Sequence, residues 1–428
     1  MIQKVLARSF CIMSFEKPSP STCVRCRGRQ WCGPTCWILE KHETKQKSIA
    51  QMNGKSFAGS SPPSVFVSHY GYPKVKIAPM APTNYLDANQ ADLLDNPERW
   101  FGKSLNELVG YRSQLIRSNI PISIHEAKDP GAELQKIQEI AMASEKVDVE
   151  VELTKNPISK LEFSHDAPPM GPQAPMKKFD LQENPKIPDK VEYLVNDRHA
   201  KAATAMSELY DKDIPVHHLY KLLSAGTLGE KENRKLVPSR WSITSVDSTI
   251  GNQVIDSIKD FPSINEYQLY ESHFIDNHFF VLFLPREWAF DIMEAYRPGS
   301  FWAQEMKEVY MSTDNEFYEG RKNYAENVAG GYYAVRLAVT EKLKEMRKQA
   351  AVLVFREIGP CYQQSLGVWL VRQTVRDAME KEPTIFDSLE SALTGIGTKL
   401  IIPMKEWKKN SKLLDRVYNQ KRLVDFFN

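Results

Sequence analysis

The sequence predicts an α+β (mixed α/β) protein that is built from more than one structural unit. The chain has 428 residues, which is more than a single hydrophobic core usually serves. Residues Val147 to Leu153 alternate strictly between apolar and acidic side chains, which is the pattern of a half-buried strand. Residues Tyr332 to Arg347 carry apolar side chains at helical spacing with Lys and Arg between them, which predicts an amphipathic helix.

The N-terminal part begins with a helix and then changes to short strands. Residues Trp37 to Gln46 are helix-like, and the segment Gly59 to Ser64, rich in Ser and Pro, predicts a turn. The apolar run Val65 to Val67 and the alternating run Lys74 to Ile77 predict two short strands with a tight connection.

A strand, a helix and a second strand are expected next. Residues Ile120 to Ile124 predict a short strand, which Pro121 confines to a sheet edge or a strand start because proline cannot donate to the ladder. Residues Ala132 to Lys146 predict a helix that leads directly into the strand from Val147. The order strand, helix, strand indicates an α/β unit.

Six prolines interrupt the chain between Asp166 and Lys190. Proline lacks the backbone donor that helices and inner strands need, and it restricts the residue before it. This stretch is therefore expected to be neither helix nor central strand. A flexible linker and a long ordered surface loop are both compatible with the residues.

More helices and one hairpin are predicted in the rest of the chain. Residues Glu192 to Leu209 and Leu366 to Glu380 predict helices. Phe274–Ile275 and His278–Leu284 flank Asp276–Asn277, which predicts a β-hairpin with a two-residue turn. Four regions are expected: a leader with a four-cysteine zinc knuckle (1–45), a large mixed α/β domain (46–297), a helix-rich C-terminal domain (298–405) and a basic, flexible tail (406–428).

The overall charge is almost balanced. The chain has 56 Lys and Arg against 54 Asp and Glu, which gives a formal net charge of +2. This balance argues against a protein coated in positive charge, so any nucleic-acid surface must be a local cluster. No apolar run reaches the roughly 20 residues that cross a bilayer, and no signal peptide is evident, so a cytoplasmic location without membrane contact is expected.

Four of the six cysteines lie close together in the sequence. Cys23, Cys26, Cys32 and Cys36 have the spacing C-x2-C-x5-C-x3-C, and four thiolates at this spacing can surround one tetrahedral metal ion. In a reducing compartment the leading interpretation is one structural zinc ion. An iron–sulfur cluster uses the same ligands, and redox-active or incidental thiols are further alternatives.

Arginines alternate through the loop between these cysteines. Arg25, Arg27 and Arg29 are followed by Trp31, and Gly28 supplies a tight turn. Arginines beside an aromatic ring on a metal-held loop can bind phosphates and stack on a base. They can equally offset the negative charge of four thiolates on one divalent ion, and the sequence favours neither interpretation.

The last nine residues form a peptide with a recognisable pattern. Gln420 is followed by Leu423 and then by Phe426 and Phe427, which is the pattern of peptides that bind the DNA sliding clamp PCNA. One turn of 3₁₀ helix would place Leu423, Phe426 and Phe427 on one side as a hydrophobic plug, and Gln420 would reach a separate polar pocket. The alternative is a terminal strand or helix that folds back to bury both phenylalanines.

Two further segments are candidates for contacts with a nucleotide or DNA. The first, Gly59 to Ser64, offers backbone N–H groups and hydroxyls that can surround a phosphate. The second, Arg240 to Asp247, combines Arg, Trp, hydroxyl groups and an acid. In the alternative interpretation the first is a rigid turn and the tryptophan of the second is a core residue. No catalytic signature is present, so the sequence leaves open whether the protein is an enzyme. The candidate side chains are Ser60, Ser61 and Ser64 in the first segment, and Arg240, Trp241 and Asp247 in the second.

Five segments of the chain have long and unusual sequences, namely Gly59–Val67, Tyr70–Val75, Pro169–Pro172, Asn184–Pro188 and Val237–Thr244. Together with the cysteine cluster and the C-terminal peptide, they closely resemble the archaeal Nre family of DNA repair proteins over nearly the whole length. The resemblance implies two Nre domains, a role in the repair of damaged DNA, clamp binding through the final peptide, and an ordered proline-rich stretch. Because residues precede the cysteine cluster, either Met1 or Met13 is a candidate for the natural start.

Two hypotheses about function follow from these observations. In the first, the protein is a non-enzymatic repair factor that PCNA recruits to DNA, with DNA, a nucleotide or other repair proteins as further partners. In the second, it is a clamp-recruited, nucleotide-binding enzyme that acts on nucleotides or DNA ends. The second hypothesis gains support if the segments around Ser60 and Arg240 meet in one concave site lined by arginine.

Overall fold

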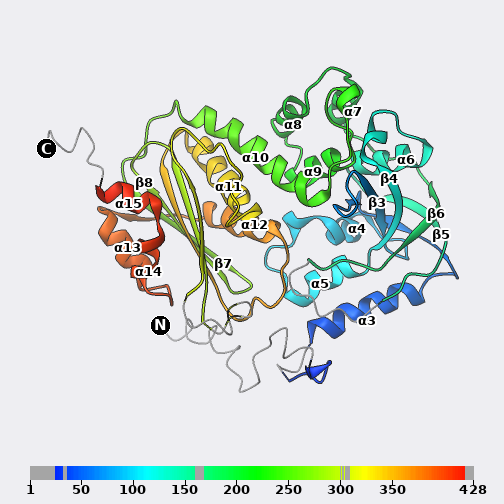
Figure 1. Cartoon of the computed structure of the whole chain (residues 1–428), viewed down its shortest axis with the longest axis horizontal. Helices are drawn as coiled ribbons and strands as arrows, with labels where there is room; N and C mark the ends of the chain where they lie inside the picture. Colours follow the sequence, from blue (N-terminus) through cyan, green and yellow to red (C-terminus); the bar gives the residue numbers. More distant parts are fainter. Residues whose placement is uncertain are drawn as a thin grey trace. The chain divides into compact units, whose positions relative to one another are not determined.

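The computed structural model describes residues 25–31, 36–159, 168–298, 300, 303 and 309–419. Two compact units divide the chain between Ile250 and Gly251 (Figure 1). The N-terminal unit takes in residues 37–159 and 169–250, and the C-terminal unit consists mainly of the residues from Gly251 onward. Each unit combines helices with a mixed six-stranded sheet, which confirms the predicted α+β class.

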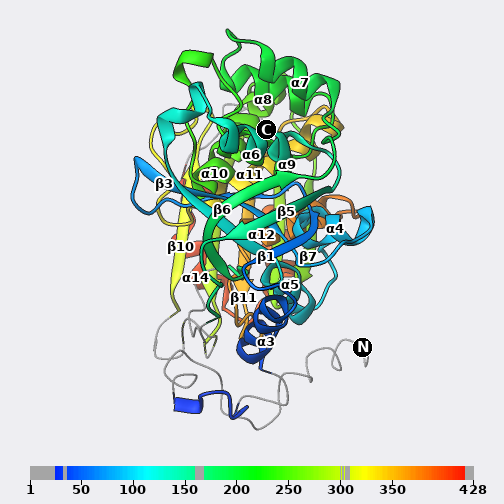
Figure 2. The same cartoon turned by 90° about the vertical axis from the view of Figure 1, so that its right-hand side faces the viewer.

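The sheet of the N-terminal unit has the strand order β1-β5-β6-β4-β3-β2, and Figure 2 shows β1, β5 and β6 side by side. Neighbouring strands are antiparallel except β4 and β6, which are parallel. The strands are β1 (Ser56–Ser61), β2 (Val65–Val67), β3 (Lys74–Ala81), β4 (Ile116–Ser123), β5 (Val147–Leu153) and β6 (Gln173–Leu181).

The N-terminal unit also contains helices, most of them short. The α-helices are α3 (Trp37–Ala50), α4 (Ala88–Asp95), α5 (Leu105–Ser113), α6 (Ala132–Met142), α7 (Asp189–Asn196), α8 (Ala202–Tyr210), α9 (Val216–Ser224) and α10 (Ser239–Ile258), and the unit boundary falls within α10. Three short 3₁₀ helices are η1 (Pro97–Arg99), η2 (Ile124–Lys128) and η3 (Lys231–Asn233).

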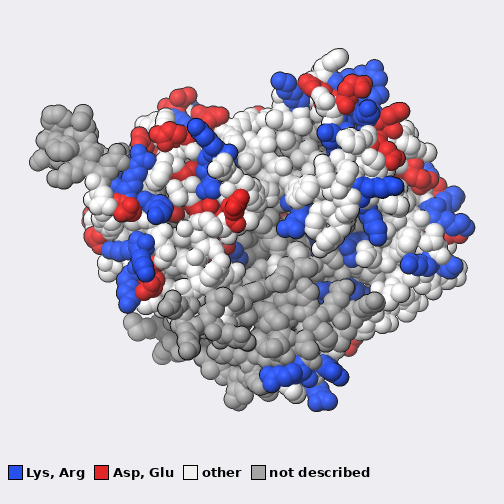
Figure 3. Space-filling model, viewed as in Figure 1, with Lys and Arg blue, Asp and Glu red and all other residues white. Residues whose placement is uncertain are grey.

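The surface carries charges of both signs. On the face drawn in Figure 3, Lys and Arg side chains are interspersed with Asp and Glu. This distribution agrees with the net charge of +2, and it points to local clusters rather than to a uniformly charged coat. Among the helices that the structure describes, none has the length and apolar character needed to span a bilayer.

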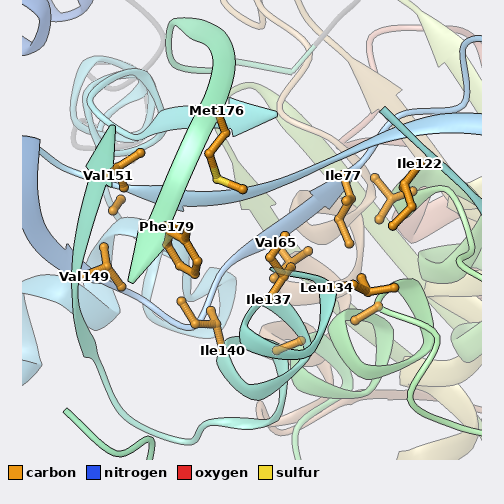
Figure 4. Packing of buried hydrophobic residues seen from close by; sticks show 14 of the residues in the cluster. Val65, Ile77, Ile122, Leu134, Ile137, Ile140, Val149, Val151, Met176 and Phe179 are labelled. Carbon is orange, nitrogen blue, oxygen red and sulfur yellow. The ribbon is translucent and has the colours of Figure 1, made fainter. Parts of the chain in front are cut away.

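Helix α6 covers one face of the N-terminal sheet and forms a core with it. Its apolar residues recur at helical spacing and pack against alternate residues of β5 and against buried residues of β6 (Figure 4). Each fully buried aliphatic side chain of this kind contributes about 1.5–3 kcal/mol relative to an exposed one. Members of this core are Leu134, Ile137 and Ile140 on the helix, with Val149, Val151, Met176 and Phe179 on the strands.

Local patterns predicted many of these elements correctly. The strand Val147–Leu153 has the predicted bounds, and its buried residues alternate as expected. The segment Gly59 to Ser64 differs, because its first half belongs to β1 rather than to a turn. Gly59 makes this possible: a Cβ atom there would lie 2.1 Å from the carbonyl oxygen of Pro82, so only glycine lets the two backbones approach.

The prediction that the proline-rich stretch holds no central strand is wrong. From residue 168 onward this stretch is ordered, and β6 lies between β5 and β4 in the sheet. Pro175 pairs with Asn119 of β4 and lies close to a register shift between β5 and β6, where β6 carries one extra residue, Lys177. The Pro175 carbonyl oxygen accepts the Thr154 N–H at 3.0 Å, so the proline still joins its neighbours without a donor of its own.

The helix predicted from Glu192 to Leu209 is divided into α7 and α8. Asp197 causes the break, because its Oδ1 atom accepts the backbone N–H groups of His199 at 2.8 Å and Ala200 at 3.1 Å. This side chain offers the backbone an alternative to continued helical bonds. Helical periodicity runs through the break, so the pattern alone did not reveal it.

The sheet of the C-terminal unit has the order β10-β9-β11-β8-β7-β12, with β9 and β11 parallel and the other neighbours antiparallel. The strands are β7 (Tyr267–Phe274), β8 (Asn277–Leu284), β9 (Ala289–Tyr296), β10 (Met311–Glu316), β11 (Ala351–Ile358) and β12 (Thr384–Phe386). The predicted hairpin is confirmed as β7 and β8, but Phe274 pairs with Asn277, so its two-residue turn is Ile275–Asp276 and not Asp276–Asn277. Ile275 and Asp276 both have positive φ values, 45° and 56°, as turns of this kind require.

Helices cover both faces of this second sheet (Figure 1). On one face α11 and α12 contact β7, β8 and β9, and on the other face α13, α14 and α15 pack against the sheet. Strand β11 is therefore buried along its whole length, which explains its nearly continuous apolar sequence. The helices are α11 (Gly330–Met346), α12 (Val368–Met379), α13 (Leu389–Gly397), α14 (Met404–Asn410) and α15 (Lys412–Asn419).

The region 298–405, expected to be rich in helices, also supplies strands β10, β11 and β12. These strands share their sheet with β7, β8 and β9, which were expected in the preceding domain. A buried strand such as β11 has no alternation of apolar and polar residues, so its period does not distinguish it from a helix.

The basic segment that was expected to be a flexible tail is folded as far as Asn419. Its Lys residues alternate with apolar residues at helical spacing, and Trp407, Leu413 and Leu414 are buried in the core under the sheet. The peptide from Gln420 to Asn428 lies outside the described residues.

Asp291 on β9 fixes the start of α15. Its Oδ2 atom accepts hydrogen bonds from the Ser411 hydroxyl at 2.7 Å and from the Leu413 N–H at 2.9 Å. The Ser411 oxygen in turn accepts the N–H of Leu414 at 3.0 Å. Burial raises the pKa of Asp291 to about 6, although these bonds favour the charged form. A carboxyl group from the sheet thus caps the last helix of the fold.

Replacing Asp291 by Asn tests this cap. Because the pKa of Asp291 is raised from 3.8 to about 6, the folded state binds its proton more tightly, and the free energy of unfolding falls as the pH rises through this window. Asp291→Asn keeps an acceptor oxygen and cannot ionise. We expect the variant to be roughly 2–3 kcal/mol more stable than the native protein near pH 7 and similar near pH 4.

Urea unfolding at both pH values measures the effect. Asp291→Ala is the control, because near pH 4 it should be less stable than Asp291→Asn for want of the acceptor. Equal pH dependence in the native protein and in Asp291→Asn would contradict the assignment.

Candidate nucleic-acid interface

The hydroxyls of the first candidate segment point into the protein. Ser60, Ser61 and Ser64 are all fully buried. The Ser60 hydroxyl donates to Asp148 Oδ1 at 2.5 Å, and the Ser61 hydroxyl donates to the Met80 carbonyl at 2.7 Å. These hydroxyls are engaged in internal bonds, so they hold the chain between β1 and β2 in place rather than face a phosphate.

Ser64 belongs to a buried ionic cluster around Asp95. Its hydroxyl donates to the Asp95 carboxylate, which also forms ion pairs with Arg112 at 2.8 Å and with Lys221 at 3.4 Å. Burial alone would raise the pKa of Asp95, but the two cations and the Ser64 bond hold it below its ordinary value. The cluster joins the start of β2 to α4, α5 and α9.

The second candidate segment is the first part of α10, and it divides into buried and exposed residues. Asp247 is fully buried, whereas Arg240 is exposed and Trp241 is 44% exposed. The interpretation of Trp241 as a core residue is therefore wrong. It lies in the first turn of α10, where the ring is presented to solvent instead of the core.

Two further exposed aromatic residues lie in the connection between β2 and β3. Tyr70 is 77% exposed and Tyr72 is 49% exposed. Gly71 between them has a φ of 84°, which favours glycine, and its carbonyl accepts the Lys74 N–H at 2.8 Å. A tight turn thus places the two tyrosine rings on the surface.

A hydrogen bond brings this connection to the start of α10. The Val67 N–H donates to the Ser239 hydroxyl at 2.9 Å. In the same region the ring of Tyr72 lies against the ring of Trp241, with 5.3 Å between centroids and 58° between planes. Two segments that are far apart in the sequence, and that both carry words typical of the resembled family, meet in this way.

Basic side chains accompany these rings. Lys74 and Lys76 alternate with the buried Val75 and Ile77 along β3, so both lysines lie on its exposed face. Within the described part of the chain, Lys74, Lys76 and Arg240 form no ion pair. We call the exposed set the aromatic–basic surface; it consists of Tyr70, Tyr72, Lys74, Lys76, Arg240 and Trp241.

Sequence reasoning found only part of this surface. Arg240 and Trp241 were predicted to contact a nucleotide or DNA. Tyr70, Tyr72 and Lys74 were identified only as part of a segment typical of the family, and Lys76 only as part of a predicted strand. The sequence signal that could have revealed the tyrosines is the arrangement Tyr70-Gly71-Tyr72. Aromatic rings on both sides of a glycine turn are too close to the surface for both to enter a core, which indicates exposed rings.

The cysteine cluster is described only in part. Cys26 is buried and Cys36 is half-buried, while Cys23 and Cys32 lie outside the described residues. Among the residues that the structure does describe, no group of three or more potential metal ligands occurs. Gly28 has a φ of 81°, as expected for the tight turn after Cys26.

The three arginines that are candidates for phosphate contacts lie in or next to this turn. Arg25, Arg27 and Arg29 are exposed, and the Arg29 N–H donates to the Cys26 carbonyl at 3.0 Å. The clamp-peptide residues cannot be placed in the same way, because Gln420, Leu423, Phe426 and Phe427 lie outside the described residues.

Comparisons with known proteins match almost the whole chain. A family model described as archaeal Nre, N-terminal, matches residues 31–303, and one described as archaeal Nre, C-terminal, matches residues 316–426. The DNA repair protein NreA of Archaeoglobus fulgidus is 38% identical over 95% of this chain and 98% of its own length.

Two other relatives match at similar length. The DNA repair protein NreB of Archaeoglobus fulgidus is 36% identical over 92% of this chain and 97% of its own length. The DNA repair protein NreA of Haloferax volcanii is 33% identical over 88% of this chain and 91% of its own length. No solved structure gives a significant match. The family models and the relatives agree, and the chain belongs to the archaeal Nre family.

Proposed function

We propose that this protein is a DNA repair factor that the sliding clamp PCNA recruits to DNA through the peptide Gln420–Asn428. The repair role is supported by the relatives, all three of which carry the name DNA repair protein. Recruitment is supported by the C-terminal peptide, in which Gln420, Leu423, Phe426 and Phe427 have the spacing of clamp-binding peptides. A protein with a net charge of only +2 has little bulk attraction for DNA, so tethering raises its local concentration there.

The folded chain next to the peptide also favours this proposal. α15 is held to the sheet through Leu413, Leu414 and the Asp291 cap, and it ends at Asn419, the residue before the peptide. A clamp bound to the peptide would therefore hold the whole C-terminal unit close to DNA.

The alternative of a clamp-recruited, nucleotide-binding enzyme places the segments Gly59 to Ser64 and Arg240 to Asp247 in one pocket, with the hydroxyls of Ser60, Ser61 and Ser64 among the groups around a phosphate. These hydroxyls are buried and bonded within the protein. Nothing about these three residues favours the enzymatic alternative over the non-enzymatic factor.

The four clustered cysteines are proposed to hold one structural zinc ion. Their number and spacing suit a tetrahedral thiolate site. The positive φ values of Arg27, Gly28 and Gln30 describe a sharp turn after Cys26, and a turn of this kind lets ligands on both sides approach one ion. In this proposal the exposed Arg25, Arg27 and Arg29 either contact phosphates or offset the thiolate charge.

Replacing both terminal phenylalanines tests clamp recruitment. We expect the variant Phe426→Ala/Phe427→Ala to bind an archaeal PCNA at least about a hundredfold more weakly, because the two rings are the largest part of the hydrophobic plug. Isothermal titration calorimetry measures the affinity, and thermal melting should be unchanged. Val424→Ala, within the same peptide but outside the plug, is the matched control. Undiminished clamp affinity in the double variant would refute the proposal.

Elemental analysis tests the metal site. We expect the purified, colourless protein to contain about one equivalent of zinc, and Cys26→Ser and Cys36→Ser to lose it. Cys11→Ser, which changes a cysteine outside the cluster, should retain the ion. A brown protein with stoichiometric iron, or full zinc content in Cys26→Ser, would exclude the structural zinc site.

A further inference from the structure

We propose that the aromatic–basic surface of the N-terminal unit binds single-stranded DNA, with Tyr72 and Trp241 stacking on unpaired bases. This proposal deepens the proposed repair role by naming the form of DNA that is bound. It uses residues of the N-terminal unit, so it is independent of the clamp peptide.

The exposure of the three rings indicates a binding surface. Tyr70, Tyr72 and Trp241 are between 44% and 77% exposed, although a ring of this size usually gains stability from burial. Both Tyr72 and Trp241 belong to rigid, well-bonded backbone rather than to a frayed end. An aromatic cluster presented to solvent in this way is a common mark of a binding site.

The backbone that carries the rings is held in one conformation. The Ile124 N–H donates to the Pro73 carbonyl at 3.0 Å, and the Val67 N–H donates to Ser239 on the other side of the connection. A Cβ atom at Gly71 would lie 2.6 Å from the Lys74 carbonyl oxygen, so the turn is closely packed. Pre-organised rings lose little conformational entropy when a ligand binds.

The charge of the surface suits a polyanion. Lys74 and Lys76 are two residues apart on one face of β3, about 6.8 Å along the strand, and Arg240 lies beside Trp241. Strand β4 pairs with β3 beside these lysines, and the acidic residue nearest to β4 in the sequence is Glu126. The Glu126 carboxylate already accepts the Ser123 N–H at 3.0 Å. Three cations on the same segments as the exposed rings give the combination of phosphate attraction and stacking surfaces by which proteins bind single strands.

Single-stranded DNA fits this surface better than duplex DNA does. In a duplex the faces of the bases are stacked on one another, so rings on a protein surface have no access to them. The protein also lacks the large positive charge that drives nonspecific duplex binding. A proline-rich peptide would use the rings but not the cations, and it is therefore a separate outcome of the test.

Fluorescence anisotropy with the full-length protein and a labelled oligo-dT of about 16 nucleotides tests the proposal. We expect Trp241→Ala and Tyr72→Ala each to weaken binding about tenfold or more, because stacking on one base contributes about 1–3 kcal/mol. Trp241→Phe should restore most of the affinity. Lys74→Gln/Lys76→Gln should weaken binding and reduce the dependence of log Kd on log salt by about one to two units, as the loss of two phosphate contacts requires.

Tyr193→Ala is the matched control. Tyr193 is 63% exposed on α7 of the same unit, and Lys190 lies 4.9 Å from the centroid of its ring, so it offers a similar aromatic–cation pair elsewhere. Its removal should leave oligo-dT binding unchanged. Thermal melting of every variant shows whether a loss comes from unfolding, and Trp241→Phe keeps the test decisive if Trp241→Ala unfolds.

Several outcomes would overturn the proposal: no binding of oligo-dT by the native protein, equal binding of a blunt duplex, binding of a proline-rich peptide instead, or native affinity in Trp241→Ala. The clamp affinity of the same variants separates this result from the proposed function. Trp241→Ala should bind PCNA normally, and Phe426→Ala/Phe427→Ala should bind oligo-dT normally, so either proposal can fail while the other stands.

Discussion

The buried carboxylate of Asp95 is the interaction on which the arrangement of the N-terminal unit depends. An isolated carboxylate in this interior would be very unfavourable, and Arg112, Lys221 and the Ser64 hydroxyl together compensate it. Removing Asp95 itself would leave the buried Lys221 without its partner, and breaking a buried ion pair in this way costs about 3–5 kcal/mol. Because Asp95 and its three partners come from four different segments, one charge fixes α4, α5 and α9 to the start of β2.

The ionic cluster around Asp95 and the aromatic–basic surface lie at opposite ends of β2, so the cluster helps to fix the position of the surface. Ser64 precedes β2, and the exposed connection that carries Tyr70 and Tyr72 follows β2 directly. On the other side, Ser239 joins this connection to α10 and hence to Trp241. The segments that resemble the family thus contain two kinds of residue. Ser64 and Ser239 form buried hydrogen bonds, and neighbouring residues of the same segments form the aromatic–basic surface.

The sequence was sufficient where the deciding pattern was local. The alternation in β5 and the hairpin of β7 and β8 depend only on adjacent residues, and both were predicted, although the turn of the hairpin lies one residue earlier than expected, at Ile275–Asp276. The strand around Pro175 was missed because its place in the sheet depends on a parallel pairing with β4, which no local pattern reports. Strand β11 was missed for a related reason: it is covered on both faces, so its apolar residues do not alternate.

The same distinction applies to the candidate site. The cysteine spacing and the clamp peptide are local motifs, so the sequence was enough to propose both. The meeting of Tyr72 with Trp241 is not local, because it requires the Val67–Ser239 bond between distant segments. The exposure of Trp241 was also unpredictable from its type, since tryptophan is usually well buried.

The capped helix α15 has a geometric consequence for the C-terminal peptide. Because Asp291 and the buried leucines hold α15, Asn419 is a fixed point on the C-terminal unit. The chain between Asn419 and Phe427 spans at most about 30 Å even when fully extended. In the proposed complex the peptide would thus be a short linker. A clamp bound to Phe426 and Phe427 would lie within about 30 Å of Asn419, so the clamp and the C-terminal unit would occupy neighbouring positions on the DNA.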